Sequence, residues 1–410
     1  MAFTMAKALL RLLPPALAGR YLGRRLFSLT DQESGRPTLL ALNRTVMSSD
    51  LRALKGRAAL NVMAVWSSDF RAMLRQRVPK REQSQTYFAG IYASYSEARR
   101  ESLRRVARAA LDGLLARTPI DAIVVANTDY WEDVVMMDVA RERGIPFLVL
   151  CRENYAVQET QDWLRNHIAK SGYTFHGDGV AVASDITKTF FEDVGCYGNS
   201  VIETVGWPRF DSWRDPNPYP PAERNLVTLV SYHDPLYLAP QNYEETLETV
   251  AAAAKASADP ARYVVKLKEE GHRAEILAIC PELAASGATI TAATPMDDLL
   301  RRSRMVIGYN TTGILEGYLG DAAIVVPWWK DAVRPAVDTL ISHETPEDRA
   351  TTHFPTSPDE LRSLMEQAFA GPLPPLGDRS VRLSRFHRFV AFDADVSAAQ
   401  KFEAFVRRFL

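Results

Sequence analysis

Cysteine is scarce in this 410-residue chain, which holds three widely separated copies, Cys151, Cys196 and Cys280. An odd number of scattered cysteines provides neither a disulfide framework nor the paired spacing of a structural zinc site. The seven histidines also stand singly, and the sequence contains no His-Glu-x-x-His motif, no Walker A loop and no Gly-x-Ser-x-Gly elbow. We therefore expect a cytoplasmic protein that has no metal site and no active site built on any of these three motifs.

An excess of charge of either sign is also missing, because 49 basic residues stand against 50 acidic ones and the net charge is -1. A chain with so little net charge has no electrostatic reason to bind nucleic acid in bulk. We therefore expect no nucleic acid among its partners.

No apolar run reaches the ~20 residues that a membrane-spanning helix needs. The N-terminal segment 5–29 comes nearest, but Arg11 and the Pro14-Pro15 pair interrupt it, and these breaks also argue against a secretory signal. We favour a pair of short helices that cover the first domain. The alternative is peripheral contact with the inner membrane, since basic side chains among leucines attract anionic lipid. The basic residues of the segment are Lys7, Arg11, Arg20, Arg24 and Arg25.

What the sequence does contain is an alternation of strand and helix patterns, which predicts parallel sheets with crossover helices. The length favours two domains, and five prolines between residues 208 and 221 place the hinge there. We assign residues 1–218 to a first domain, 219–385 to a second and 386–410 to a helical tail. The expected strands are 38–43, 59–65, 121–127, 146–151, 179–184, 200–206, 225–232, 262–268, 305–308 and 322–326; the expected helices include 92–117, 131–144 and 242–255, one from residue 185 and one with Thr294 as its N-cap.

The turn after strand 305–308 carries hydroxyls and glycine where bulky side chains would pack better. Asn310, Thr311, Thr312 and Gly313 open a helix there, and the free N–H groups of a helix start at a strand end suit a phosphate. Glu316, one turn into the helix, would accept hydrogen bonds from sugar hydroxyls. The alternative is ordinary capping by one of the threonines, with the glycine relieving a close contact.

Two further strand ends in the second domain carry candidate residues. Lys266 and Lys268 alternate along strand 262–268 and project from one face, where two ammonium groups would neutralise a nucleotide phosphate; the alternative is a solvated strand end. His233 and Asp234 follow strand 225–232. Their loop is either catalytic or an ordinary turn, because Asp before Pro is a common turn initiator.

The first domain offers carboxylates after two of its strands. Glu153 follows strand 146–151, and Asp129 follows strand 121–127. Asp129 has a competing role as the N-cap of the next helix, whereas Glu153 has no evident capping role, so we rank Glu153 first as a general acid or base. Two carboxylates are sufficient for glycosyl transfer without a metal, since one acts at the anomeric carbon and the other exchanges a proton with the acceptor.

These parts together resemble the GT-B glycosyltransferases, especially enzymes of bacterial surface polysaccharides. The resemblance rests on the strand 305–308, the turn 310–313, Glu316 and the strand ending at Pro327, with VGWPRFD (205–211) at the position of the family's hinge. Lys266 matches the lysine of the group's Lys-x-His-Pro signature, but Lys268-Glu269 replaces His-Pro.

The resemblance implies a fold of two Rossmann-like domains that face a cleft, with the C-terminal helix packed back on the first domain. It also implies a metal-independent enzyme that transfers a sugar from a nucleotide donor to a cell-surface glycan or glycolipid, such as lipopolysaccharide or capsule. Within the group, the retaining β-Kdo transferases are similar, which favours CMP-Kdo or a related keto-sugar as donor substrate, with no cofactor. On that similarity Asp234 is the nucleophile and Glu153 the proton shuttle, while the second domain holds the nucleotide. Asp129 is a further catalytic candidate because of its place after strand 121–127.

Other functions stay open at this point. A UDP- or GDP-hexose transferase, a nucleotide-sugar epimerase and a CDP-polyol phosphotransferase would share the architecture. A catalytically silent subunit that binds a glycan or a nucleotide is the alternative from outside the enzymes.

Overall fold

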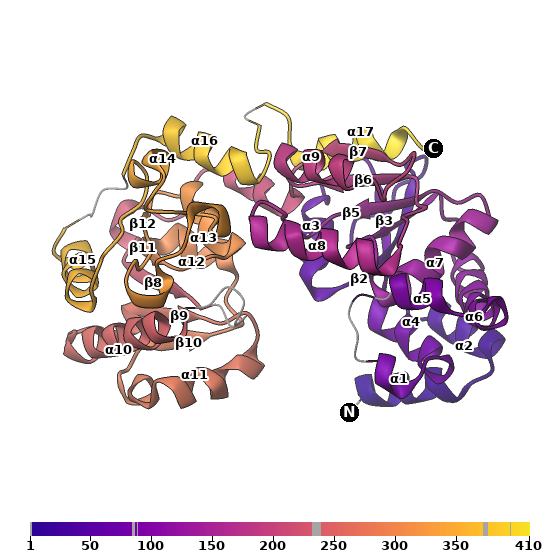
Figure 1. Cartoon of the computed structure of the whole chain (residues 1–410), viewed down its shortest axis with the longest axis horizontal. Coiled ribbons are helices and arrows are strands. Elements are labelled where there is room, and N and C mark those ends of the chain that lie inside the picture. Colours follow the sequence, from indigo (N-terminus) through magenta and orange to yellow (C-terminus); the bar gives the residue numbers. More distant parts are fainter. Residues whose placement is uncertain (1, 84–86, 88, 232–238, 372–375, 394) are drawn as a thin grey trace. The chain divides into compact units, whose positions relative to one another are not determined.

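The computed structural model describes residues 2–83, 87, 89–231, 239–371, 376–393 and 395–410 (Figure 1). The chain forms two compact units. Unit 1 comprises Met1–Ala156, Thr160–Ser212 and Phe389–Leu410, and unit 2 comprises Val157–Glu159 and Trp213–Arg388. The chain therefore passes from unit 1 to unit 2 close to residue 212, where the sequence analysis expects 218, and returns at 389, where it expects 386.

Unit 1 is built on a seven-stranded sheet in the order β1-β3-β2-β4-β5-β6-β7. All neighbouring pairs are parallel except β1 with β3. The parallel sheet expected from the alternating pattern is confirmed, and only the two-residue edge strand β1 was not expected. The strands are β1 (Phe27–Ser28), β2 (Thr38–Asn43), β3 (Asn61–Trp66), β4 (Ala122–Val125), β5 (Phe147–Leu150), β6 (Gly179–Val182) and β7 (Val201–Thr204).

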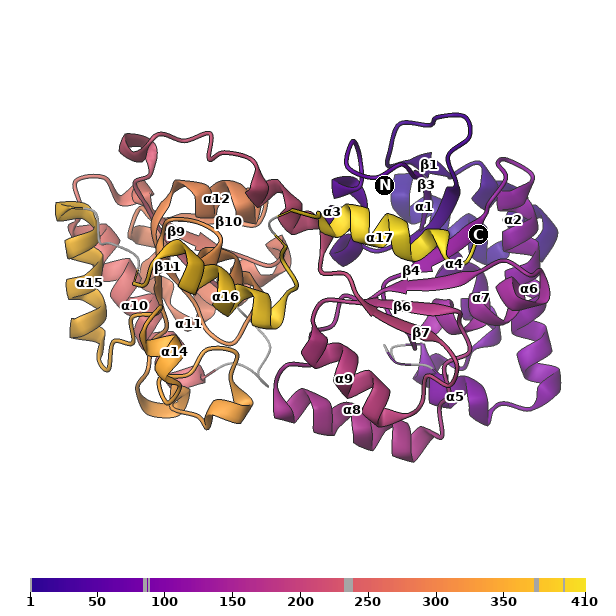
Figure 2. The ribbon, with the colours of Figure 1, turned by 90° about the horizontal axis from the view of Figure 1, so that it is seen from above.

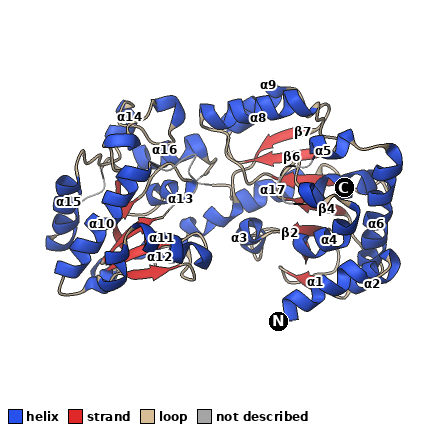
Figure 3. Cartoon of the chain, turned by 60° about the horizontal axis from the view of Figure 1, so that its bottom comes forward, coloured by secondary structure: helices blue, strands red, loops and turns tan. Residues whose placement is uncertain are grey.

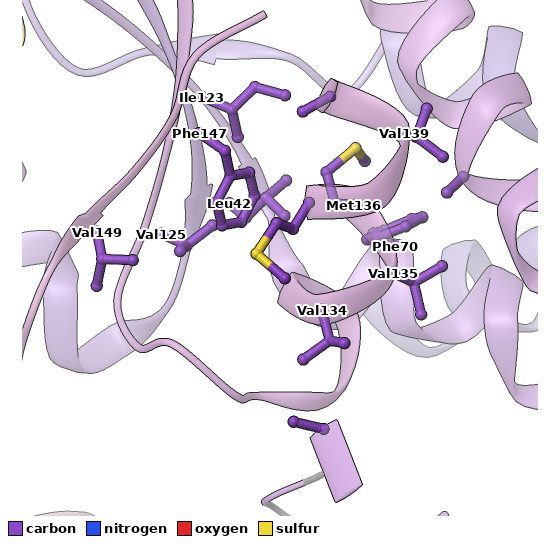
Figure 4. Packing of buried hydrophobic residues seen from close by; sticks show 14 of the residues in the cluster. Leu42, Phe70, Ile123, Val125, Val134, Val135, Met136, Val139, Phe147 and Val149 are labelled. Carbon is purple, nitrogen blue, oxygen red and sulfur yellow. The ribbon is translucent and has the colours of Figure 1, made fainter. Parts of the chain in front are cut away.

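Helices cover both faces of this sheet, which explains why its strands are almost continuously apolar. Along β2 the side chains alternate between the faces: Leu40 and Leu42 belong to one buried cluster, and Leu39 and Ala41 to another. Figure 4 shows the first cluster, where Leu42 lies among side chains of β4, β5 and α7. The helices of unit 1 are α1 (Ala2–Leu12), α2 (Pro15–Gly23), α3 (Thr45–Ala53), α4 (Ser67–Leu74), α5 (Ala89–Ser94), α6 (Glu97–Leu115), α7 (Trp131–Glu142), α8 (Gln158–Ser171), α9 (Asp185–Val194) and α17 (Ala398–Arg407).

The N-terminal segment forms the expected pair of short helices, α1 and α2. Helix α2 packs against α6 with very little room between the two backbones. A Cβ atom built on Gly19 would lie 1.8 Å from the carbonyl oxygen of Ala109, and one built on Gly113 would lie 2.0 Å from the carbonyl oxygen of Gly19. In the described part of the chain, no helix is both long enough and apolar enough to cross a membrane. Peripheral membrane contact through this segment stays a prediction.

The C-terminal helix α17 packs on unit 1, as expected (Figure 2). Its residues Phe402, Phe405 and Val406 are fully buried in the second cluster, together with side chains of β2, β3 and α3. The helix start is fixed by Asp211, whose two carboxylate oxygens accept hydrogen bonds from the backbone N–H groups of residues 398 and 399, each at 2.9 Å. A carboxylate at this end also complements the helix dipole.

Unit 2 contains a five-stranded sheet in the order β10-β9-β8-β11-β12, and every pair is parallel. Figure 3 shows the strands in red among the helices of the unit. This is the strand order of a Rossmann-like sheet. The strands are β8 (Leu226–Val230), β9 (Tyr263–Lys266), β10 (Thr289–Thr291), β11 (Ser303–Ile307) and β12 (Ala323–Val325). The helices are α10 (Pro240–Ala256), α11 (Arg273–Ile279), α12 (Met296–Arg302), α13 (Thr312–Leu315), α14 (Pro346–Arg349), α15 (Pro358–Ala370) and α16 (Arg379–Phe389).

The fold class is therefore α/β with two Rossmann-like units, as the sequence predicts. One helix start in unit 2 differs from the expectation. Helix α12 begins at Met296 with Pro295 at the N-cap position, so Thr294 is not the cap. The hydroxyl of Thr294 lies 3.0 Å from that of Thr291 instead, and this contact holds it in the preceding turn. The cleft between the domains stays a prediction.

Candidate functional site

Each sheet has one topological switch point, where neighbouring strands send their chains to opposite faces and where open α/β sheets bind ligands. In unit 1 the switch point lies between β2 and β4, because the following strands are added outward from these two. In unit 2 it lies between β8 and β11. The residues that follow these strands are the candidates for function.

In unit 1, the loop after β4 is shaped by a side chain that imitates a backbone turn. The carboxamide oxygen of Asn127 accepts hydrogen bonds from the N–H groups of Thr128 at 2.6 Å and Asp129 at 3.3 Å. All three residues are buried. The turn leaves the amide nitrogen of Asn127 directed toward the loop after β5, where its Nδ2 lies 3.5 Å from an oxygen of Glu153.

Glu153 is half-buried, and its two carboxylate oxygens have different surroundings. Oε1 accepts a hydrogen bond from the hydroxyl of Tyr130 at 2.6 Å. The same oxygen is the one that Nδ2 of Asn127 contacts. Oε2 has no hydrogen-bond partner among the described residues. A carboxylate that is oriented through one oxygen and open at the other is suited to exchange a proton with a substrate. Burial, and then the neighbouring Glu153, raise the pKa of Tyr130 well above its ordinary value, so the phenol stays a donor.

Asp129 is held by a histidine from a distant part of the chain. Its Oδ2 lies 3.1 Å from Nε2 of His167 on α8. Burial raises the pKa of Asp129, and the contact with His167 works in the opposite direction. The alternative role as an N-cap is wrong, because the N-cap of α7 is Tyr130 and no side chain caps that helix.

Behind these residues lies a buried ionic cluster. Arg44, which follows β2, donates from Nη2 to Oε1 of Glu132 at 2.6 Å, and Arg71 donates to the other oxygen at 2.8 Å. Asp133 is completely buried, and neither of its carboxyl oxygens has a hydrogen-bond partner among the described residues. Burial raises its pKa well above the ordinary value, although the neighbouring Arg44 acts to lower it. The cluster fixes the start of α7 and with it the position of Tyr130.

A second buried acid lies under the loop after β5. Asp50 on α3 is fully buried and contacts the guanidinium groups of Arg152 at 2.8 Å and Arg209 at 3.3 Å. Both guanidinium groups also lie over the ring of Trp207, at 5.0 and 4.2 Å from its centroid. Burial raises the pKa of Asp50 to about 6, although Arg152 acts to lower it. The guanidinium group of Arg152 is thereby engaged by Asp50.

In unit 2, the turn after β11 is tightly packed. A Cβ atom built on Gly308 would lie 2.7 Å from Cδ1 of Ile314, and one built on Gly313 would lie 3.0 Å from Cε of Met296. Thr311 is the N-cap of α13 and accepts from the N–H of Gly313 at 3.3 Å. The glycines therefore permit close packing and one threonine caps the helix, while the hydroxyl of Thr312 has no hydrogen-bond partner among the described residues.

The helix that follows is shorter than expected. Helix α13 ends at Leu315, and Glu316 begins a 3₁₀ turn that ends at Tyr318. Gly317 within this turn lies against β12, since a Cβ on it would be 3.1 Å from Cγ1 of Ile324. Glu316 is buried, with 8% of its surface exposed. Its predicted contact with sugar hydroxyls stays a prediction.

The side chain of Asn310 fastens a neighbouring loop. Its Nδ2 donates to the carbonyl oxygen of Asp338 at 3.0 Å, and its Oδ1 accepts from the N–H of Leu340 at 2.6 Å. Lys266 lies at the end of β9, and its ammonium donates to the carbonyl oxygens of Leu267 and Ala292, each at 2.8 Å. Burial lowers the pKa of Lys266. One of its three N–H groups is left for a ligand.

Three further residues of unit 2 were predicted to belong to the site. Lys268 lies beyond the end of β9 and is exposed. His233 and Asp234 lie outside the described residues. The roles of these three residues in binding or catalysis stay predictions.

Several residues of the unit 1 site were not predicted from the sequence. Arg44 follows β2 directly and Arg152 lies two residues after the end of β5, so the rule that selects Glu153 would also have selected them. His167 lies on α8, 38 residues after Asp129, and no local pattern links the two. Among the described residues, no group of three or more His, Cys, Asp or Glu side chains is placed to hold a metal ion.

No family model matches the sequence, and no curated protein matches it. Solved structures of similar fold do exist. One is the UDP-forming α,α-trehalose-phosphate synthase of Burkholderia vietnamiensis, at 12% identity over 91% of this chain and 98% of that chain, with a TM-score of 0.47. Others are a UGT transferase of Siraitia grosvenorii in complex with UDP (10% identity, 91% and 99%, TM-score 0.43) and MnaA of S. aureus with UDP (11% identity, 88% and 94%, TM-score 0.45).

Proposed function

We propose that the protein is a glycosyltransferase of the GT-B type that uses a nucleotide-sugar donor. The observation that carries the proposal is the state of Glu153: a carboxylate at the carboxyl edge of a doubly wound sheet, oriented by Tyr130 through one oxygen and open at the other. Asp129, held by His167, supplies a second acid in the same loop region.

In the proposed reaction, unit 1 binds the acceptor and unit 2 the nucleotide. Glu153 accepts the proton of the acceptor hydroxyl, the hydroxyl oxygen forms a bond to the anomeric carbon of the donor, and the bond from that carbon to the nucleotide phosphate breaks. The phosphate leaves with the bonding electron pair. The turn after β11 supports nucleotide binding in unit 2, because it lies at the switch point and leaves the hydroxyl of Thr312 available.

The proposal extends to the identity of the donor and of the acceptor. A CMP-activated keto-sugar follows from the resemblance of the sequence to β-Kdo transferases, and a UDP-hexose is the competing donor. The acceptor is proposed to be a surface glycan or glycolipid. Independence from metal stays a prediction.

Donor turnover in the presence of acceptor glycans tests the proposal. The full chain is incubated with UDP-glucose, UDP-N-acetylglucosamine or CMP-Kdo, and the released nucleotide and the glycosylated product are measured. Glu153→Gln is expected to lower turnover by about 10²–10⁴-fold, while titration with UDP and CMP shows unchanged nucleotide affinity. Glu192→Gln, an exposed carboxylate on α9 of the same unit, is the matched control.

The competing functions give different results. An epimerase would convert the donor in the absence of any acceptor, and a binding subunit would bind a nucleotide or glycan and turn over nothing. Normal turnover in Glu153→Gln would remove Glu153 from the proposed mechanism.

A further inference from the structure

Four aromatic rings lie beside the two acids of unit 1. Tyr87, Tyr130, Trp163 and His167, which we call the aromatic platform, come from three separate parts of the chain. The ring centroids of Tyr87 and Trp163 are 4.6 Å apart, and the rings of Trp163 and His167 are stacked at 5.3 Å with an interplanar angle of 6°. Tyr87 also lies 5.8 Å from the ring of Tyr130 and pairs with its backbone in a short antiparallel bridge.

The folding of unit 1 does not explain why the platform includes an exposed tryptophan. Trp163 is 41% exposed, whereas Trp207, in the same unit, is 1% exposed. Helix α8 is anchored by Leu164, its one buried residue in the described structure. Trp163 packs against Tyr87 and His167 and still presents part of its aromatic surface to solvent, and such amphipathic rings are enriched at binding interfaces.

The platform is linked directly to both candidate acids. The hydroxyl of Tyr130 donates to Oε1 of Glu153 at 2.6 Å, and Nε2 of His167 contacts Asp129 at 3.1 Å. A pyranose ring has an apolar face of C–H groups and an edge of hydroxyls. Such a ring, stacked on the platform, would bring a hydroxyl within reach of the half-buried Glu153, whose Oε2 is open to accept a hydrogen bond, whereas Asp129 is only 3% exposed.

The charges at this place decide which sugars fit. Asp129 and Glu153 adjoin the platform, and the guanidinium group of Arg44, 4.1 Å from the ring centroid of Tyr130, is paired with Glu132. A carboxylate or phosphate on the sugar would lie close to these two acids, and like charges repel.

We infer that the aromatic platform is the subsite for the acceptor sugar, and that it takes an uncharged pyranose ring. The role of the bound sugar as the acceptor rests on the proposed function. The binding of the sugar itself needs no donor. The inference makes Trp163 a determinant of acceptor binding, and it excludes acidic sugars from this position.

Saturation-transfer difference NMR on the full chain, without any nucleotide, tests the inference. The neutral probes are methyl α-D-glucopyranoside and methyl β-D-galactopyranoside, and the anionic probes are glucuronic acid and glucose 6-phosphate. We expect saturation transfer to the ring C–H protons of a neutral probe and an affinity that falls about tenfold or more in Trp163→Ala. Trp163→Phe should keep most of the affinity, because it keeps an aromatic face.

Asn166→Ala, an exposed neighbour on α8, is the matched control and should bind like the wild type. Unchanged affinity in Trp163→Ala, equal binding of the anionic probes, or no saturation transfer to either neutral probe would overturn the inference. Failure of the proposed function gives a different result: sugars bind through Trp163, but no donor is turned over with any acceptor.

Discussion

Asp50 is a carboxyl group buried completely between two arginines, and its titration is expected to affect stability. Burial raises its pKa from 3.8 to about 6. Between these values the folded protein holds a proton that the unfolded chain has released. The free energy of unfolding therefore falls as pH rises through this window. A shift of about two pKa units corresponds to about 3 kcal/mol.

Urea unfolding at several pH values between about 4 and 7 measures this effect. Asp50→Asn cannot titrate at this position, so the stability of the wild type relative to the variant should decrease by about 3 kcal/mol as pH rises. A relative stability that stays constant across the window would contradict the raised pKa.

At the residue level, the sequence indicates where strands end, but not which side chains contact the residues at those ends. Glu153 could be selected because it follows a buried strand and has no capping role. Asp129 was ambiguous, because the cap that it could form and the contact with His167 that it does form involve the same carboxylate. The partner lies on a separate helix, and its approach depends on the tertiary packing of α8, which no local pattern encodes.

Among the elements, the crossing of α2 and α6 depends on glycine. Gly19 lies so close to α6 that an added methyl group would meet a backbone carbonyl, which cannot rotate away. Gly19→Ala is therefore expected to destabilise unit 1 by about 1–3 kcal/mol or more. Thermal unfolding followed by calorimetry measures this change. Gly371→Ala is the matched control, because nothing lies within 4 Å of its added Cβ, and equal effects of the two substitutions would contradict the packing argument.

The elements themselves were largely predictable, and their ends were less so. Each expected strand appears within a few residues of its position, since buried parallel strands give short apolar runs between turn residues. The helix expected over 92–117 is divided into α5 and α6, with Ser96 in extended conformation between them. The helix after Thr312 stops after one turn, where Gly317 packs closely on Ile324. Such limits arise from contacts between elements rather than from the propensity of one segment.

For the whole molecule, the last helix is expected to control the stability of unit 1 and not that of unit 2. Phe405 is fully buried against the sheet of unit 1, so Phe405→Ala should lower the stability of this unit by about 3–5 kcal/mol. Calorimetry of the full chain should show one transition moved to lower temperature and the other unchanged. Phe409→Ala, at a half-buried position, should have a smaller effect. A shift of both transitions by the same amount would contradict the assignment of α17 to unit 1.

The return of residues 389–410 to unit 1 has a consequence for biosynthesis. Chains emerge from the ribosome N-terminus first, and an N-terminal domain usually folds before the next one is made. Here the first 212 residues lack the helix that closes one face of their sheet. About 200 further residues must be translated before that helix appears, which takes roughly 10–40 s at about 5–20 residues per second. During this interval the apolar side chains that α17 covers stay exposed in the nascent chain, so we expect it to need a chaperone until translation ends.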